Sequence, residues 1–135
     1  MKISEERPWV VLVDDEAEVL SALLRCLRNE PYEVLTTCLP ERALRWVHCF
    51  DVAAVVSDQR MPGLAGTEFL DRVSSSSPFT ARILLTAYPS DPAMVSGLRR
   101  SAQCMIAKPW DEFLLRRTLK DFVSGHASAA AGGGR

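Results

Sequence analysis

The sequence lacks the features that mark membrane and secreted proteins. No apolar run approaches the roughly 18–20 residues that a bilayer-spanning helix needs. The opening segment, MKISEERPW, leads only to the short apolar run 10–13 before two acidic residues, which argues against a signal peptide. These absences predict a cytoplasmic protein with no membrane association.

An excess of positive charge and paired cysteines are also absent. The 16 Lys and Arg residues are balanced by 17 Asp and Glu residues, which disfavours direct binding of nucleic acid. The cysteines form no C-x-x-C pair, and neither histidine lies at metal-ligand spacing from a partner, so a zinc site or a disulfide framework is disfavoured. We expect reduced thiols, buried or half-buried, at four positions: Cys26, Cys38, Cys49 and Cys104.

Short apolar runs alternate with amphipathic segments along the chain. The 135 residues, 47% of them hydrophobic and 24% charged, suit one globular domain. The runs that predict strands are 9–13, 32–37, 52–57, 82–86 and 103–107. The segments that predict helices are 16–29, 40–50, 66–74, a short one that opens at Asp91-Pro92, and 111–123. The pattern indicates a doubly wound (βα)5 fold with a parallel sheet, in a domain over 1–123. The Gly-, Ala- and Ser-rich residues 124–135 are expected to form a flexible tail or linker.

Polar residues follow the predicted strands at the edge where ligands of parallel sheets bind. They are Asp14, Asp15 and Glu16 after the first strand, Asp58 after the third, Thr86 at the end of the fourth and Lys108 after the fifth. The glycine-rich motifs G-x-G-x-x-G and G-x-x-x-x-G-K-[ST] are missing, so this edge is not predicted to bind a nucleotide or a flavin.

The residue types at this edge suggest phosphoryl chemistry that depends on a divalent cation. Clustered carboxylates repel one another unless a cation intervenes, and oxygen ligands suit Mg²⁺ or Mn²⁺. Asp58 can attack phosphorus as a carboxylate nucleophile. Lys108 would hold one phosphoryl oxygen as a point charge, and the Thr86 hydroxyl could donate to another.

These residues together resemble the receiver domain of two-component response regulators. The resemblance covers residues 9–123 and rests on Asp14-Asp15, on Asp58 with Met61-Pro62-Gly63, on Thr86, and on Lys108-Pro109. It implies a flavodoxin-like sheet of five parallel strands in the order 2-1-3-4-5. It also implies that the chain is a signalling module with self-phosphorylation and slow self-dephosphorylation, not a conventional enzyme.

The resemblance assigns the metal ligands and the phosphoacceptor. Asp58 corresponds to the residue that accepts a phosphoryl group from the phosphohistidine of a sensor histidine kinase or a phosphotransfer protein. Asp15 corresponds to the direct Mg²⁺ ligand and Asp14 to a ligand through water. Asp58 itself and the Arg60 backbone carbonyl correspond to the further protein ligands. Phosphorylation is then expected to change the surface formed by the fourth helix, fifth strand and fifth helix.

Other positions match the conformational switch of the family or depart from it. Thr86 corresponds to the switch hydroxyl and Lys108 to the phosphoryl-binding lysine, which a cis bond to Pro109 is expected to follow. Met105 stands where the family usually has a switch Tyr or Phe. Ala65 replaces a common Asp or Asn in the loop after Pro62.

Arg60 and Tyr88 occupy the two positions that tune phosphate lifetime in the family. We hypothesise that these large side chains shield the acyl phosphate from water. A phosphohydrolase would need a second acid two residues after the nucleophile, where this chain has Arg60, so that alternative is disfavoured.

The remaining alternative is a pseudo-receiver, which binds partners without a phosphate cycle. Met105 favours that alternative, and the intact set of Asp15, Asp58, Thr86 and Lys108 argues against it. The strings DQRMPG (58–63) and KPWD (108–111) resemble receivers that precede output domains, so an output domain or a downstream protein is an expected partner. Whether the protein forms a homodimer stays open.

Overall fold

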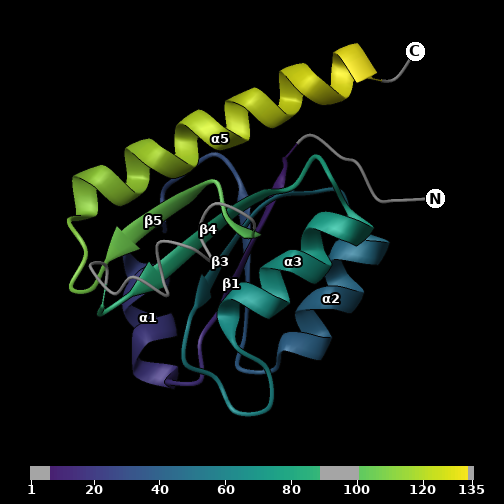
Figure 1. Cartoon of the computed structure of the whole chain (residues 1–135). Helices are drawn as coiled ribbons and strands as arrows, with labels where there is room; N and C mark the ends of the chain where they lie inside the picture. Colours follow the sequence, from purple (N-terminus) through teal and green to yellow (C-terminus); the bar gives the residue numbers. More distant parts are fainter. Residues whose placement is uncertain (1–6, 89–100, 134–135) are drawn as a thin grey trace.

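The chain folds into a five-stranded parallel sheet covered by helices (Figure 1). The computed structural model describes residues 7–88 and 101–133, with side chains described as far as residue 126. The strands are β1 (Trp9–Val13), β2 (Glu33–Thr37), β3 (Val52–Asp58), β4 (Ala81–Thr86) and β5 (Cys104–Ala107). The helices are α1 (Ala17–Cys26), α2 (Pro40–Cys49), α3 (Gly66–Ser76) and α5 (Glu112–Gly133). The helix predicted to open at Asp91-Pro92 lies outside the described residues.

The strand order is β2-β1-β3-β4-β5, and each neighbouring pair is parallel. This order confirms the predicted doubly wound α/β fold. The central strand β3 is buried along its whole length, as its run of small and β-branched side chains predicts for a strand covered on both faces.

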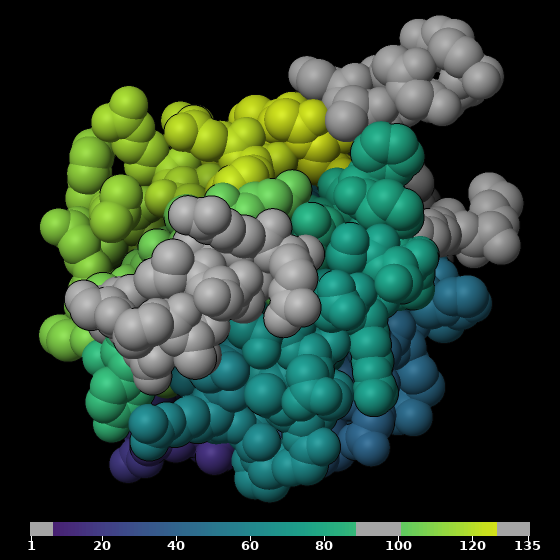
Figure 2. All heavy atoms as spheres, in the orientation of Figure 1, coloured from purple at the N-terminus to yellow at the C-terminus, as the bar shows by residue number. Residues whose placement is uncertain are grey.

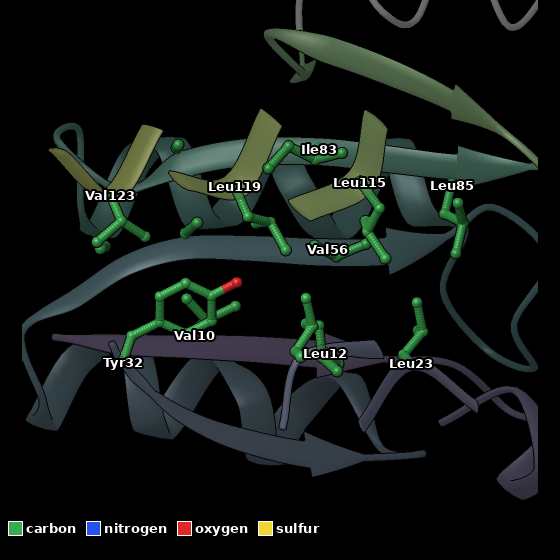
Figure 3. Packing of buried hydrophobic residues seen from close by; sticks show 14 of the residues in the cluster. Val10, Leu12, Leu23, Tyr32, Val56, Ile83, Leu85, Leu115, Leu119 and Val123 are labelled. Atoms are coloured by element: carbon green, nitrogen blue, oxygen red, sulfur yellow. The ribbon is translucent and has the colours of Figure 1, made fainter. Parts of the chain in front are cut away.

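Two apolar clusters hold helices against opposite faces of the sheet. On one face, α1 and α5 pack through Leu23, Leu115 and Leu119 against sheet residues that include Val10 and Ile83 (Figure 3). On the other face lie α2 and α3, whose contact residues are Ala43, Val47, Phe69, Leu70 and Val73. The surface view shows α5 and the α2–α3 pair on different sides of the molecule (Figure 2). Helices therefore cover both faces of the sheet, so a ligand can reach the sheet at the ends of its strands.

Helix α5 continues beyond the predicted limit at residue 123 and ends at Gly133. The segment 124–133, expected to be flexible, is helical in the structure. His126 explains its start: this buried side chain contacts the Phe79 carbonyl through Nδ1 at 3.0 Å and the Asp51 carboxylate through Nε2 at 3.0 Å. The boundary of the receiver domain at residue 123 stays a prediction.

The thiols are free but differ in exposure. Cys26 and Cys104 are half-buried, as predicted, whereas the prediction is wrong for Cys38 and Cys49, which are exposed. Each exposed cysteine lies at an end of α2 or next to it, where no second layer covers the side chain. None of the helices within residues 7–88 and 101–133 has the length and apolar composition of a membrane-spanning segment.

Candidate phosphoacceptor site

The strand register brings the polar residues predicted from sequence to one edge of the sheet. Val13 pairs with Ser57, so Asp14 and Asp58 follow side by side at the ends of β1 and β3. On the far side of β3, Asp58 pairs with Leu85, which immediately precedes Thr86. Parallel pairing thus assembles carboxylates and a hydroxyl that are far apart in the chain.

Lys108 bridges the two carboxylates. Its Nζ donates to Asp14 Oδ2 at 2.9 Å and to Asp58 Oδ1 at 3.0 Å. The backbone places this ammonium group, because Thr86 pairs with Ala107 and the Lys108 N–H donates to the Thr86 carbonyl at 2.8 Å. The bond from Lys108 to Pro109 is cis, as the resemblance implied.

Burial and neighbouring charges shift the pKa values of this cluster. Burial raises the pKa of Asp14, and the charge of Asp58 adds to the rise, while bonds from the Glu16 N–H and Lys108 oppose it. Burial alone would lower the pKa of Lys108, but its hydrogen bonds to both carboxylates and their attraction raise it. The site holds more negative charge than its one lysine relieves, a condition that a bound cation would relieve further.

The carboxylates at the end of β1 provide a donor set that fits Mg²⁺. Oxygen atoms of Asp14, Asp15 and Glu16 all lie within 4.8 Å of one another, and oxygen-only donors suit this ion. Asp14 is buried, whereas Asp15 and Glu16 are exposed. Asp58 is not in this triplet, but it shares Lys108 with Asp14, so its carboxylate lies next to the same donor set. Glu16 is a ligand candidate beyond those predicted from the sequence, and its place directly after Asp14-Asp15 is the signal that could have indicated it.

Two glycines shape the loop between β3 and α3. Gly63 has a φ of +83°, a conformation that L side chains rarely adopt. Gly66 lies so close to Asp58 that an added Cβ would overlap the Asp58 carbonyl oxygen and reach 2.9 Å from the Gln59 Cα. Helix α3 therefore starts directly against the backbone of the phosphoacceptor candidate.

An open cavity of about 360 Å³ lies over Asp58. Its lining residues are Asp15, Glu16, Asp58, Arg60, Thr86, Ala87, Tyr88 and Lys108. The guanidinium carbon of Arg60 lies 4.2 Å from the centre of the Tyr88 ring, a cation–π contact. The two residues predicted to influence phosphate lifetime thus meet in one wall of the cavity.

Thr86 and Met105 lie on neighbouring strands. Thr86 is buried, and its Oγ1 accepts the Tyr88 N–H at 3.0 Å. Met105 on β5 pairs with Leu84 in the register and is half-buried against the cluster that packs α2 and α3. The thioether fills the position with an apolar group that has no hydroxyl or ring.

Gln59 is the residue whose place sequence reasoning missed. Its side-chain Oε1 accepts the Thr67 N–H at 2.9 Å, across the loop at the start of α3. The available signal was Ala65: the residue before a helix usually supplies a capping oxygen, and alanine has none.

The strand order and the carboxylate edge define the chain as a flavodoxin-like α/β domain whose ligand edge carries acids in place of a phosphate-binding glycine loop. The family model of the response regulator receiver domain matches residues 10–120. The chain therefore belongs to the response regulator receiver family and is a signalling module of two-component systems.

Curated relatives agree with this assignment. The chain is 34% identical over 109 residues to the hydrogenase transcriptional regulatory protein HoxA of Cupriavidus necator, covering 80% of this chain and 22% of that protein. It is 30% identical over 118 residues to the response regulator protein FleR of Pseudomonas aeruginosa, covering 87% of this chain and 24% of that protein. The chain spans about a quarter of the length of these relatives or less.

Solved structures share the fold. The signal receiver domain of an HD domain-containing protein from Pseudomonas fluorescens Pf-5 superposes with a TM-score of 0.87 at 26% identity, covering 97% of each chain. The receiver domain of the sensor histidine kinase PA1611 from Pseudomonas aeruginosa superposes with a TM-score of 0.79 at 22% identity, covering 87% of this chain and 98% of that one. That second structure holds a magnesium ion in its active-site cleft.

Proposed function

We propose that Asp58 accepts a phosphoryl group in a Mg²⁺-dependent reaction, from a sensor histidine kinase or a phosphotransfer protein. The observation that carries the proposal is the lysine bridge, in which Lys108 joins Asp58 to the buried Asp14. A carboxylate next to a cavity, a fixed ammonium group and a set of oxygen donors are the parts that phosphoryl transfer to an acid needs.

The transfer exchanges one bond to phosphorus for another. A carboxylate oxygen of Asp58 attacks the phosphorus of a phosphohistidine, the P–N bond breaks, and its electron pair returns to the donor imidazole. The product is an acyl phosphate on Asp58. Asp14, Asp15, Asp58 and the Arg60 carbonyl would hold Mg²⁺, or Mn²⁺ in its place, and the ion would neutralise charge on the phosphoryl oxygens.

Lys108 and Thr86 would then bind the new phosphoryl group. Lys108 already contacts Asp58 Oδ1, so a short movement exchanges a carboxylate oxygen for a phosphoryl oxygen. Thr86 would turn its hydroxyl from the Tyr88 N–H toward the phosphoryl group, which shifts the equilibrium between two conformations. The changed surface would include β5, α5 and the segment between β4 and β5.

The output of the switch is proposed from the relatives. HoxA is named as a transcriptional regulatory protein, and an output domain or a separate downstream protein would read the changed surface here. Dimer formation on phosphorylation is one form that this readout can take. A cytoplasmic location is part of the same proposal.

Arg60 and Tyr88 would slow hydrolysis of the acyl phosphate. Their stacked side chains line the cavity through which water reaches Asp58. Cutting both back to alanine should shorten the half-life of the phosphorylated protein, measured by intact mass after removal of the phosphodonor. An unchanged or longer half-life would contradict this role.

The first experiment is intact-mass analysis after incubation with acetyl phosphate and Mg²⁺. We expect a gain of one phosphoryl group that is lost with Asp58→Asn and with EDTA. No gain in a wild-type protein shown to be folded by circular dichroism would reject the proposal and favour a pseudo-receiver that binds partners without a phosphate cycle.

A further inference from the structure

The loop between β3 and α3 is closed at its base by one residue, Gln59. Its side-chain Oε1 accepts the Thr67 N–H at 2.9 Å, and its Nε2 makes a longer contact of 3.4 Å with the Thr67 hydroxyl. Its main-chain carbonyl accepts the Gly66 N–H at 2.9 Å. Both the backbone and the side chain of Gln59 are therefore attached to the first turn of α3.

The helix needs this contact because its own N-cap residue provides none. Ala65 precedes α3 and makes no side-chain capping bond. The first N–H groups of a helix lack partners within the helix, and Gln59 satisfies that of Thr67 from the other end of the loop. The bond between Gln59 and Thr67 thus both caps α3 and closes the loop between β3 and α3.

The position of Gln59 connects this closure to the site. It lies between Asp58 and Arg60, whose carbonyl is the proposed metal ligand. The Asp58 carbonyl is held by the Ser57 hydroxyl at 2.8 Å and abuts Gly66. Strand β3 therefore fixes the backbone up to Asp58. Gln59 attaches the backbone that follows to α3.

We infer that Gln59 is a positioning residue that orients the Arg60 carbonyl and the Asp58 backbone for Mg²⁺ binding. The inference rests on the proposed function, since it concerns the ion of that same reaction. Groups that hold a metal-binding backbone in place act on affinity without touching the ion. Loss of the Gln59 side chain should therefore weaken Mg²⁺ binding and slow phosphorylation at limiting Mg²⁺, with the rate recovered at saturating Mg²⁺.

A matched control exists at the opposite edge of the sheet. The Gln103 Oε1 accepts the Arg82 N–H at 2.6 Å, so Gln103→Ala removes the same kind of side-chain-to-backbone bond at the start of β4, whereas Asp58 pairs with Leu85 near the end of that strand. A second control separates the helix cap from the loop closure. Adding Ala65→Ser to Gln59→Ala supplies a new N-cap oxygen for α3 but no attachment to the loop.

The experiment measures the Mg²⁺ dissociation constant by calorimetry and the melting temperature in EDTA for each variant. Gln59→Ala should weaken Mg²⁺ binding by about 10-fold, and the double variant should regain melting temperature without regaining affinity. Gln103→Ala should lower the melting temperature and leave Mg²⁺ affinity unchanged.

Two outcomes overturn the inference in distinguishable ways. If wild type binds Mg²⁺ and Gln59→Ala binds it within twofold, or the double variant recovers affinity with stability, Gln59 is only a helix cap. If wild type itself fails to bind Mg²⁺ and to gain a phosphoryl group, the proposed function fails, and the inference fails with it.

Discussion

The two ends of the parallel strands differ in how their polar groups are paired. We call the end at which the strands finish the carboxyl edge and the end at which they begin the amino edge. At the carboxyl edge, Asp14 and Asp58 share one lysine, and the pKa of Asp14 is raised by burial. At the amino edge, the buried Thr80 hydroxyl donates to the Val52 carbonyl at 2.7 Å and lies 2.7 Å from the Ser77 hydroxyl.

These buried hydroxyl groups at the amino edge therefore have hydrogen-bond partners. Arg82 adds to them by donating to the carbonyls of Ser101 at 2.9 Å and Thr80 at 3.1 Å. Satisfied buried hydrogen bonds stabilise a fold, while a surplus of buried charge is retained at a cost. We therefore expect the amino edge to contribute stability and the carboxyl edge to contribute ligand binding. Substitutions at each edge can test this expectation.

The largest expected effect concerns the backbone contact that supports the carboxyl edge. Gly66→Ala should lower the free energy of unfolding by about 3 kcal/mol because the new Cβ overlaps the Asp58 carbonyl. Gly63→Ala is the matched control: within residues 7–88 and 101–133, nothing lies within 4 Å of an added Cβ, so only the φ of +83° is unfavourable. That strain should cost about 1 kcal/mol. Urea denaturation measures both, and equal losses would show that crowding against Asp58 is unimportant.

The next effect tests the amino edge. Thr80→Val keeps the shape of the side chain but removes its bonds to Val52 and Ser77, which should cost about 2 kcal/mol. Thr36→Val on β2 is the control, because its half-buried hydroxyl makes no side-chain hydrogen bond among the described residues. Thermal unfolding should separate the two variants; a Thr80→Val protein as stable as the control would mean that the network contributes nothing.

Removing a charge from the carboxyl edge should stabilise the protein, whereas the substitutions above destabilise it. Asp14→Asn should stabilise the protein in EDTA at neutral pH by about 1 kcal/mol, because a buried carboxylate is replaced by a neutral group. It should also abolish tight Mg²⁺ binding. Asp51→Asn is the control at the amino edge, where removing the carboxylate weakens the contact to His126 and should destabilise.

The pH dependence of this stabilisation has a definite direction. The pKa of Asp14 in the folded protein is raised above the ordinary value of 3.8. A raised pKa contributes stability that is complete below the unfolded value and is lost as pH rises through the folded value. The gain from Asp14→Asn should thus be absent in acid and grow toward neutral pH. A gain that is the same at all pH values would contradict burial of the charge as its cause.

The sequence was sufficient to predict most of this architecture, and physical reasons explain why. Apolar runs such as 52–57 favour strands covered on both faces, and parallel strands carry their carboxyl ends to one edge. Asp58 and Asp14 were therefore predictable as neighbours although 44 positions separate them in the numbering. The chemistry of the site followed from residue types at strand ends.

The remaining features depend on contacts that no local pattern encodes. His126 lies in a stretch of Gly, Ala and Ser whose composition favours a linker, and its bond to Asp51 spans 75 positions. Gln59 acquires its role only when the loop returns to α3 and meets an N-cap residue without an oxygen. Such contacts can be recognised only in the folded chain, because neither partner belongs to a sequence motif that predicts the contact.

The smallest expected change in stability concerns a polar atom in the apolar cluster that packs α1 and α5 against the sheet. The Tyr32 hydroxyl is buried beneath α5 and has no hydrogen-bond partner among the residues that the structure describes (Figure 3). Burial, with the charge of Glu30, raises its pKa. Tyr32→Phe removes an unsatisfied group and should stabilise by about 0.5–1 kcal/mol. Tyr88→Phe is the control, since that ring is half-exposed and keeps its contact with Arg60. Destabilisation by Tyr32→Phe would mean that the hydroxyl is bonded to a buried water and is not an unsatisfied polar group.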